Sequence, residues 1–147
     1  MNRLMFTSAM MLVSTFFTGC IEVTPALPPA PGGIQARNVN STNANSQIRV
    51  WILTEEQIAT PPTTKTEAEK LESFVQPRFR TFTYNRVAGT YYVVASNEAH
   101  YQSLTDTEPF ELGVDFSLLE VEVEGELIPV SVSNTSTPTR LPRITRP

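Results

Sequence analysis

The chain has 147 residues, a net charge of −4, 12 prolines, one cysteine and one histidine. This length corresponds to one domain at most. A single cysteine cannot form an intramolecular disulfide or a cysteine-rich zinc site, which excludes a disulfide-stabilised scaffold and a zinc finger. The mild acidic charge argues against nucleic acid as a partner, because proteins that bind it usually carry a strongly basic face.

Residues 1–19 are typical of a secretory signal peptide. Arg3 supplies their only charge, and an apolar stretch follows from Leu4 to Phe17. At about 14 residues, this stretch suits the hydrophobic region of a signal peptide and is shorter than the roughly 20 residues of a membrane-spanning helix. We therefore exclude the segment from the fold.

The only cysteine follows this segment directly, in the sequence Phe17-Thr18-Gly19-Cys20. The sequence resembles the lipobox of bacterial lipoproteins, although an aliphatic residue is more usual at position 17. The resemblance implies that Cys20 is the mature N-terminus and the lipidation site, with covalent diacylglycerol and N-acyl chains and no other cofactor. Several acyl chains on one residue form a stable membrane anchor. The alternative is an ordinary signal peptide, or a signal anchor, in which Cys20 has no such role.

The residue after Cys20 is Ile21. In the lipoprotein class, an Asp at this place often signals retention in the inner membrane of enteric-type bacteria. The resemblance therefore implies delivery to the outer membrane, with the lipid anchor on the periplasmic side.

Residues 20–47 are predicted to form a tether. They hold four prolines, the pair Gly32-Gly33 and an Asn/Ser/Thr tract. Such a composition cannot bury enough apolar area to offset the entropy of ordering it. We expect an extended Pro-rich half and a flexible remainder that hold a domain off a membrane.

The candidate domain spans residues 48–133 and opens with a predicted strand. Ile48, Val50 and Ile52 lie on one face of this strand and Trp51 lies on the other. Since both faces are apolar, we expect the strand to be central in its sheet or covered by a helix.

Two helices are predicted next. The sequence from Thr54 to Gln57 has the spacing of a capping box and indicates a short helical turn. A second helix of about ten residues begins near Thr64 or Thr66, where either threonine can cap it. Its apolar stripe of Leu71, Phe74 and Val75 ends before Pro77.

The rest of the domain reads as strands. Residues 78–84 and 90–96 are predicted to pair as a hairpin through a five-residue loop. A polar loop over 100–109 and a short strand over 110–116 follow.

Residues 118–133 alternate between apolar and polar side chains and are predicted as a second hairpin. A type II′ turn at Gly125-Glu126 pairs Val123 with Ile128 and Val121 with Val130. Pro129 cannot donate a ladder hydrogen bond, which predicts that the last strand lies at an edge. The fold class is therefore mostly β, either a small antiparallel β-sandwich or a sheet with one or two short helices.

Residues 134–147 are predicted to form a disordered, basic, Pro-rich tail. The candidate domain holds 6 basic and 14 acidic side chains, a net of −8, whereas the tail carries three arginines and no acid. Such a tail can become ordered along a sheet edge or an acidic groove of a partner, or it can remain an unstructured end.

No catalytic or metal-ligating residues are predicted. Residues 106–126 hold eight acidic side chains and no Lys or Arg, but no calcium-binding loop motif is present. This acidic run is either a surface for a basic partner or a solvated strand face. His100 is interpreted as a loop histidine, because no nucleophile in a suitable context accompanies it.

The predicted binding face combines arginines with exposed aromatic rings, a composition typical of protein-binding hot spots. Its residues are Arg78, Arg80, Tyr84, Arg86, Tyr91 and Tyr92 in the first hairpin and Arg140, Arg143 and Arg146 in the tail.

The favoured hypothesis is a non-enzymatic outer-membrane lipoprotein that binds another envelope protein within an assembly such as a secretion system. The order of short helices and strands, with the segment GTYYVVAS at 89–96, resembles the lipoprotein that anchors type VI secretion membrane complexes. That resemblance implies a transthyretin-like sandwich. The alternatives are a periplasmic ligand-binding or enzyme-inhibitor module for peptidoglycan or another glycan, and a hydrolase that uses acidic residues.

Overall fold

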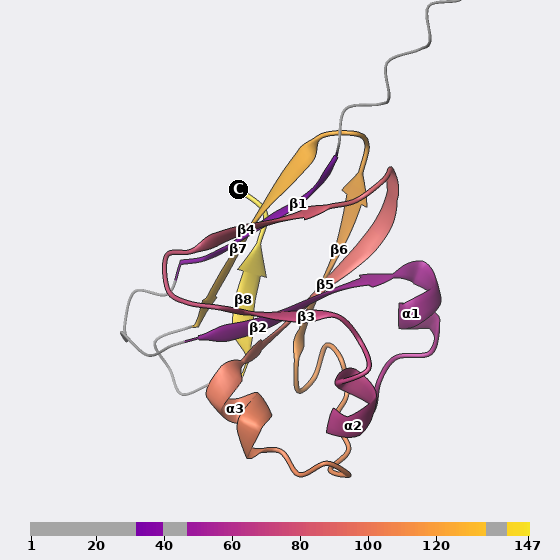
Figure 1. Cartoon of the computed structure of the whole chain (residues 1–147), viewed down its shortest axis with the longest axis vertical. Helices are drawn as coiled ribbons and strands as arrows, with labels where there is room; N and C mark the ends of the chain where they lie inside the picture. The colour runs from indigo at the N-terminus through magenta and orange to yellow at the C-terminus, as the bar shows by residue number, and fades with distance from the viewer. Residues whose placement is uncertain (1–31, 40–46, 135–140) are drawn as a thin grey trace, which may run out of the picture.

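The computed structural model describes residues 32–39, 47–134 and 141–147. These residues form two four-stranded sheets packed face to face, with three short helices beside one sheet (Figure 1). The prediction of a mostly-β fold and a small sandwich is confirmed. The helices number three in the described part of the chain, where one or two were expected.

The first sheet, which we call sheet A, has the strand order β4-β1-β7-β8. Its strands are β4 (Thr81–Asn85), β1 (Gly33–Asn38), β7 (Leu127–Asn134) and β8 (Pro142–Thr145). β1 runs antiparallel to β4 and parallel to β7, and β8 runs antiparallel to β7. The N-terminal strand is therefore internal to its sheet.

The second sheet, sheet B, has the order β3-β2-β5-β6 and is antiparallel throughout. Its strands are β3 (Ser73–Gln76), β2 (Ile48–Thr54), β5 (Gly89–Asn97) and β6 (Ser117–Val123). The prediction for β2 is confirmed, because it is central in the sheet and apolar on both faces.

The helices α1 (Glu55–Ala59), α2 (Lys65–Ala68) and α3 (Glu98–Ser103) lie against sheet B (Figure 1). The predicted capping box of α1 is present: the backbone N–H of Gln57 donates to Oγ1 of Thr54 at 3.3 Å, and the Thr54 N–H donates to Oε1 of Gln57 at 2.9 Å. Thr64 caps α2. Asn97 caps α3, which replaces the start of the predicted polar loop.

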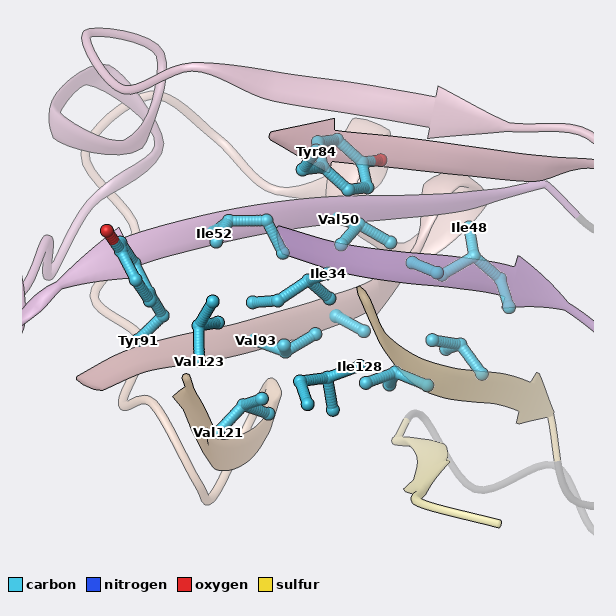
Figure 2. Close-up of a cluster of buried hydrophobic side chains, with 14 residues drawn as sticks. Ile34, Ile48, Val50, Ile52, Tyr84, Tyr91, Val93, Val121, Val123 and Ile128 are labelled. Carbon is cyan, nitrogen blue, oxygen red and sulfur yellow. The ribbon is translucent and has the colours of Figure 1, made fainter. Parts of the chain in front are cut away.

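Two hydrophobic cores result from this layering. The inner core lies between the sheets and includes Ile34, Val50, Val93 and Ile128 (Figure 2). The outer core lies between sheet B and the helices. Its buried members are Trp51, Leu53, Ala68, Val94, Tyr101, Leu104, Phe110 and Phe116.

The predicted boundary of the tether is wrong, because β1 lies within residues 20–47. The pair Gly32-Gly33, which was interpreted as linker, is required by packing. A Cβ on Gly32 would approach the Cα of Gly125 to 2.9 Å, and one on Gly33 would collide with the carbonyl oxygen of Tyr84. Glycine permits this close approach of strands.

The predicted disorder of the tail is wrong for residues 142–145, which form β8. β8 pairs with residues 131–134 of β7, and Ile144 packs against the inner core. The hydroxyl of Ser117 on β6 donates to the carbonyl oxygen of Pro142. The domain therefore extends beyond 48–133 on both sides.

The second predicted helix is wrong beyond Ala68. α2 has four residues, and Phe74 and Val75 belong to β3, which pairs with β2. An aromatic and a β-branched residue fit a strand better than the end of a helix. The predicted strand over 110–116 is a loop in which Phe110 and Phe116 stack with centroids 4.4 Å apart.

Neither predicted hairpin forms, because each supposed pair of strands is divided between the sheets. β4 lies in sheet A and β5 in sheet B. In the same way, β7 lies in sheet A and β6 lies in sheet B. Val123 faces Gly89, and Ile128 faces Ile34. β7 is internal rather than an edge, although β8 does not extend as far as Pro129.

Candidate interaction surface

The three tyrosines predicted to bind a partner contribute mainly to the cores. Tyr84 and Tyr91 are 4% and 7% exposed and pack between the sheets (Figure 2). The Tyr91 hydroxyl donates to the carbonyl oxygen of Val87 at 3.0 Å. Tyr92 is half-buried against the outer core, where burial and the Glu120 carboxylate raise its pKa. These rings do not form one exposed surface.

The outer face of sheet A is uncovered and polar. We call this surface the arginine face, because Arg37 and Arg143 are the only charged residues in the four strands of sheet A. Both side chains are exposed. The outward polar residues of the face are Gln35, Arg37, Thr81, Thr83, Asn85, Ser131, Ser133, Arg143 and Thr145, and the apolar Leu127 and Pro129 lie on the same side near the start of β7.

Strand register gives the dimensions of the arginine face. Arg37 lies opposite Thr81 on one side and Ser131 on the other, and Ser131 lies opposite Thr145. Such a row crosses four strands and is about 14 Å wide, since neighbouring strands lie about 4.8 Å apart. This flat surface of hydroxyl and guanidinium donors is suited to binding carboxylates or other anions.

A tight turn with an exposed aromatic ring adjoins this face. The turn, residues 77–80, links β3 to β4, and Arg80 directly precedes the outward residue Thr81. Phe79 is 55% exposed and has φ 58°, and the Arg78 guanidinium lies 4.3 Å from the centre of its ring. We call residues 77–80 the Phe79 turn. The predicted binding residues Arg78 and Arg80 therefore flank a ring that was not among the predicted binding residues.

Buried polar groups hold the Phe79 turn against sheet A. The Phe79 N–H donates to the carbonyl oxygen of Asn38 at 2.8 Å, and the Asn38 N–H donates to that of Arg80 at 3.1 Å. Nδ2 of Asn38 donates to the Gln76 carbonyl oxygen at 2.9 Å, and Nε2 of Gln76 donates to the Tyr84 hydroxyl at 2.7 Å. Burial raises the pKa of Tyr84 to about 12, so this hydroxyl is neutral at physiological pH.

The other predicted arginines do not lie together in one cluster. Arg86 lies between β4 and β5, where its guanidinium is 3.7 Å from the exposed Glu72 carboxylate. Arg143 is on β8 and Arg146 follows it, both exposed. Arg140 and the predicted lipidation residue Cys20 lie outside the described residues, as do the predicted signal peptide and most of the tether.

A charged cluster that the sequence did not indicate connects α3 to sheet B. Nε and Nη2 of Arg49 donate to the two carboxylate oxygens of Glu98 at 2.7 and 2.8 Å, and Nη1 donates to Ser73 at 2.9 Å. Burial disfavours the charged carboxylate, but hydrogen bonds from Arg49 and Gln102 outweigh this effect and lower the pKa of Glu98. Arg49 also lies 4.7 Å from the centre of the Tyr101 ring. The only sequence signal for this cluster was the N-cap Asn97 followed by Glu98.

This cluster is suited to holding the fold together. Each of the three guanidinium nitrogens of Arg49 donates a hydrogen bond to a protein partner, and the Tyr101 side chain is buried. Burial raises the pKa of Tyr101, which makes its hydroxyl a poor proton donor near neutral pH. The cluster therefore resembles a structural ion pair more than a reacting group.

The acidic run does not converge on one point. No group of three His, Cys, Asp or Glu side chains suited to a metal ion occurs within residues 32–39, 47–134 and 141–147. Glu120, Glu122 and Glu124 are exposed, as alternation predicts for the outward side of a strand. His100 lies on α3 and contacts Phe116 edge-on, with ring centroids 6.3 Å apart.

Two shallow grooves flank residues 60–63 on the helix-covered side. One, of about 410 Å³, is lined by residues that include Thr60, Lys70 and Leu71. The other, of about 280 Å³, is lined mainly by apolar side chains and includes Phe110 and Leu118. Both are open. The first is lined by the oppositely charged Glu67 and Lys70, and the hydrogen bonds that the Glu67 carboxylate accepts are from Thr63.

In the part of the chain that the structure describes, no helix is long and apolar enough to cross a membrane. The fold and surface together define a small β-sandwich with one basic, uncovered sheet face. No family model, curated protein or solved structure matches this chain.

Proposed function

We propose that this chain is a non-enzymatic lipoprotein, anchored through Cys20 to the periplasmic side of the outer membrane. Its sandwich binds another envelope protein through the arginine face, as part of an assembly such as a secretion system. The observation that carries the proposal is that sheet A is left uncovered and has only arginines as charged residues, whereas sheet B is covered by the outer core.

The composition of the arginine face supports a protein partner. An antiparallel sheet face can simply be solvated, but such faces usually mix both signs of charge. Here 14 acidic side chains belong to residues 48–133, and none of them lies in a strand of sheet A. A face with one sign of charge steers and orients an oppositely charged partner.

The length of chain before the domain supports the proposed anchor. Gly32 is twelve positions after Cys20, and a chain of that length spans at most about 40 Å. The sandwich would therefore stay close to the bilayer that holds the lipid. This reach is less than half of what a tether ending at residue 47 would allow.

The resemblance to the type VI secretion lipoprotein remains part of the proposal. A transthyretin-like sandwich has two four-stranded sheets, and this domain also has two, with α3 between β5 and β6. This agreement is one of architecture alone, and the envelope assembly enters the proposal by analogy, because a fold does not determine a function.

The anchor is tested with the full chain in a bacterial envelope. We expect Cys20→Ser to move the protein from the membrane fraction to the soluble fraction, and the wild-type protein to carry the mass of acyl chains. Membrane association that survives the substitution, together with a mass without acyl groups, would show that Cys20 is not the anchor.

The binding role is tested by crosslinking intact envelopes and purifying the full chain. Arg37→Glu is compared with Lys70→Glu, an equal charge change on an exposed residue beside α2. We expect Arg37→Glu to reduce recovery of a stoichiometric protein partner about tenfold and Lys70→Glu to leave it unchanged. Equal recovery with both variants, or no protein partner of the wild type, contradicts the proposal. Sedimentation with purified peptidoglycan that depends on Arg37 would assign the face to a glycan instead.

A further inference from the structure

Phe79 combines two features that are unfavourable for an isolated domain. Its ring is 55% exposed, and its backbone has φ 58°, in the left-handed region. Among the non-glycine residues that the structure describes, no other has a positive φ. Left-handed backbone is unfavourable for a bulky side chain, and such residues persist where the surrounding structure holds them in place for a function.

The restraints on Phe79 come from buried groups. The main chain of Asn38 bonds to both Phe79 and Arg80, and the side chain of Asn38 reaches the carbonyl oxygen of Gln76. Asn38 and Gln76 are fully buried, so water does not compete for these bonds. The turn therefore keeps its shape without help from the ring.

The ring is not required by either core. Phe79 belongs to neither hydrophobic cluster, and the Arg78 guanidinium lies 4.3 Å from the centre of its ring. Arg80, the residue that follows Phe79 in the sequence, is exposed. An exposed aromatic ring between arginines is the composition of a binding hot spot, and a rigid backbone lowers the entropy lost on binding.

The position of the turn favours a protein over the anchoring bilayer. Gly33 pairs with Asn85 at one end of β1, while Arg37 pairs with Thr81 at the other, next to the Phe79 turn. The ring is therefore about 17 Å or more from the end at which the chain enters the domain. An anchor before Gly32 therefore joins the domain at the end of β1 opposite the Phe79 turn.

We propose that Phe79 is a preorganised anchor that inserts into an apolar pocket of a partner protein whose rim carries Asp or Glu carboxylates. The carboxylates face the exposed Arg80, and the arginine face extends the contact. This inference rests on the proposed function, since it identifies the part of the binding surface that contributes most and the chemistry that it recognises.

The first test places a photoreactive phenylalanine analogue in the full chain, in cells, at position 79 or at position 87. Val87 is the matched control, because it is 80% exposed but lies between β4 and β5 at the Gly32 end. We expect position 79 to give an adduct with one protein, at a peptide with apolar residues and acidic neighbours, and position 87 to give none with that protein. Adducts with lipid alone, the same protein adduct at both positions, or no adduct at position 79 would overturn the inference.

The second test removes the ring but preserves the turn. Glycine adopts φ 58° without strain, so Phe79→Gly should keep Tm equal or raise it while lowering recovery of the crosslinked partner about tenfold. Val87→Gly should leave recovery unchanged, and Phe79→Tyr should largely retain it. If Arg37→Glu abolishes recovery but Phe79→Gly does not, the anchor is wrong and the proposed function stands. If the wild-type chain recovers no protein, the proposed function itself is wrong.

Discussion

The outer faces of the two sheets differ in what covers them. On sheet B, Trp51, Leu53 and Val94 lie beneath short helices and the loop that contains Phe110 and Phe116. On sheet A, the matching positions are occupied mainly by threonine, serine, glutamine and arginine, with Leu127 and Pro129 near one end, and no helix in the described part of the chain covers them. One face is thus committed to the stability of the fold, and the other is available for contacts outside it.

This comparison separates substitutions that unfold the domain from those that change only its surface. Apolar burial is the dominant favourable term in folding, and a side chain on a bare sheet face contributes little of it. Substitutions in the two cores should therefore cost more stability than substitutions on the arginine face.

The largest effect is expected at Trp51 in the outer core. Its ring is 2% exposed, stacks on Phe116 at 5.6 Å and meets Tyr101 edge-on at 5.3 Å. Trp51→Ala should lower the free energy of unfolding by about 3–5 kcal/mol, because it leaves a large cavity. Denaturant titration measures this change. Thr83→Ala on the arginine face is the control and should stay within about 0.5 kcal/mol; equal losses for the two variants would contradict the comparison.

A smaller effect is expected in β8, where neighbouring residues point to opposite faces. Ile144 packs against the inner core, and Thr145 is exposed on the arginine face. Ile144→Asp should cost roughly 2 kcal/mol or more, because it buries a carboxylate without a partner. Thr145→Asp should be almost neutral by the same titration. If neither substitution changes the free energy of unfolding, β8 does not contribute to the stability of the fold.

A loss of about 1–2 kcal/mol is expected for Glu98→Gln, which breaks the charged contact between α3 and sheet B. The folded state lowers the pKa of Glu98, so the carboxylate stabilises the fold above its unfolded pKa. The advantage of the wild type over the glutamine variant should therefore disappear as pH falls through the folded pKa. Glu122→Gln, at an exposed position of β6, is the control and should change the free energy of unfolding by no more than about 0.5 kcal/mol.

The smallest effect at neutral pH is expected at Tyr84, on the inner side of sheet A. Burial raises its pKa to about 12, so folding favours the neutral phenol. The stability that this shift contributes is present below the unfolded pKa and is lost as pH rises toward 12. Ultraviolet titration should show a tyrosine that ionises near pH 12 in the wild type and is lost in Tyr84→Phe, whereas Tyr92 and Tyr101, whose pKa values are also raised, are retained. A normal titration of all four tyrosines would contradict this.

The sequence predicted which face of each strand is buried better than it predicted which strands pair with each other. Alternation correctly placed Val121, Val123, Ile128 and Val130 in the core, because period-2 patterning reports which side chains are buried. It contains no information on which strand lies alongside. Connections that look like hairpin loops instead cross from one sheet to the other, so the pairings of both hairpins were wrong.

The elements that were missed are short and locally atypical. β1 has the sequence GIQARN and contains a buried asparagine, and β8 has the sequence PRIT. Both strands are ordered by pairing with β7, and for β1 this partner is distant in the sequence. The residues of the candidate site also include some that the sequence predicted and some that it did not. The arginines at 78, 80 and 143 were predicted, but the strained ring at Phe79 depends on backbone geometry that composition does not report.

The place of β1 within sheet A has a mechanical consequence. β1 is bonded to β4 on one side and to β7 on the other, and the chain enters it at Gly33. A pull on the N-terminal side of Gly32 acts along the strand, whereas the ladder hydrogen bonds lie across it. Such tension shears the bonds of both ladders together and does not peel them one at a time. A protein held by its N-terminus and loaded at the far end of the sandwich would thus resist force where the chain is attached.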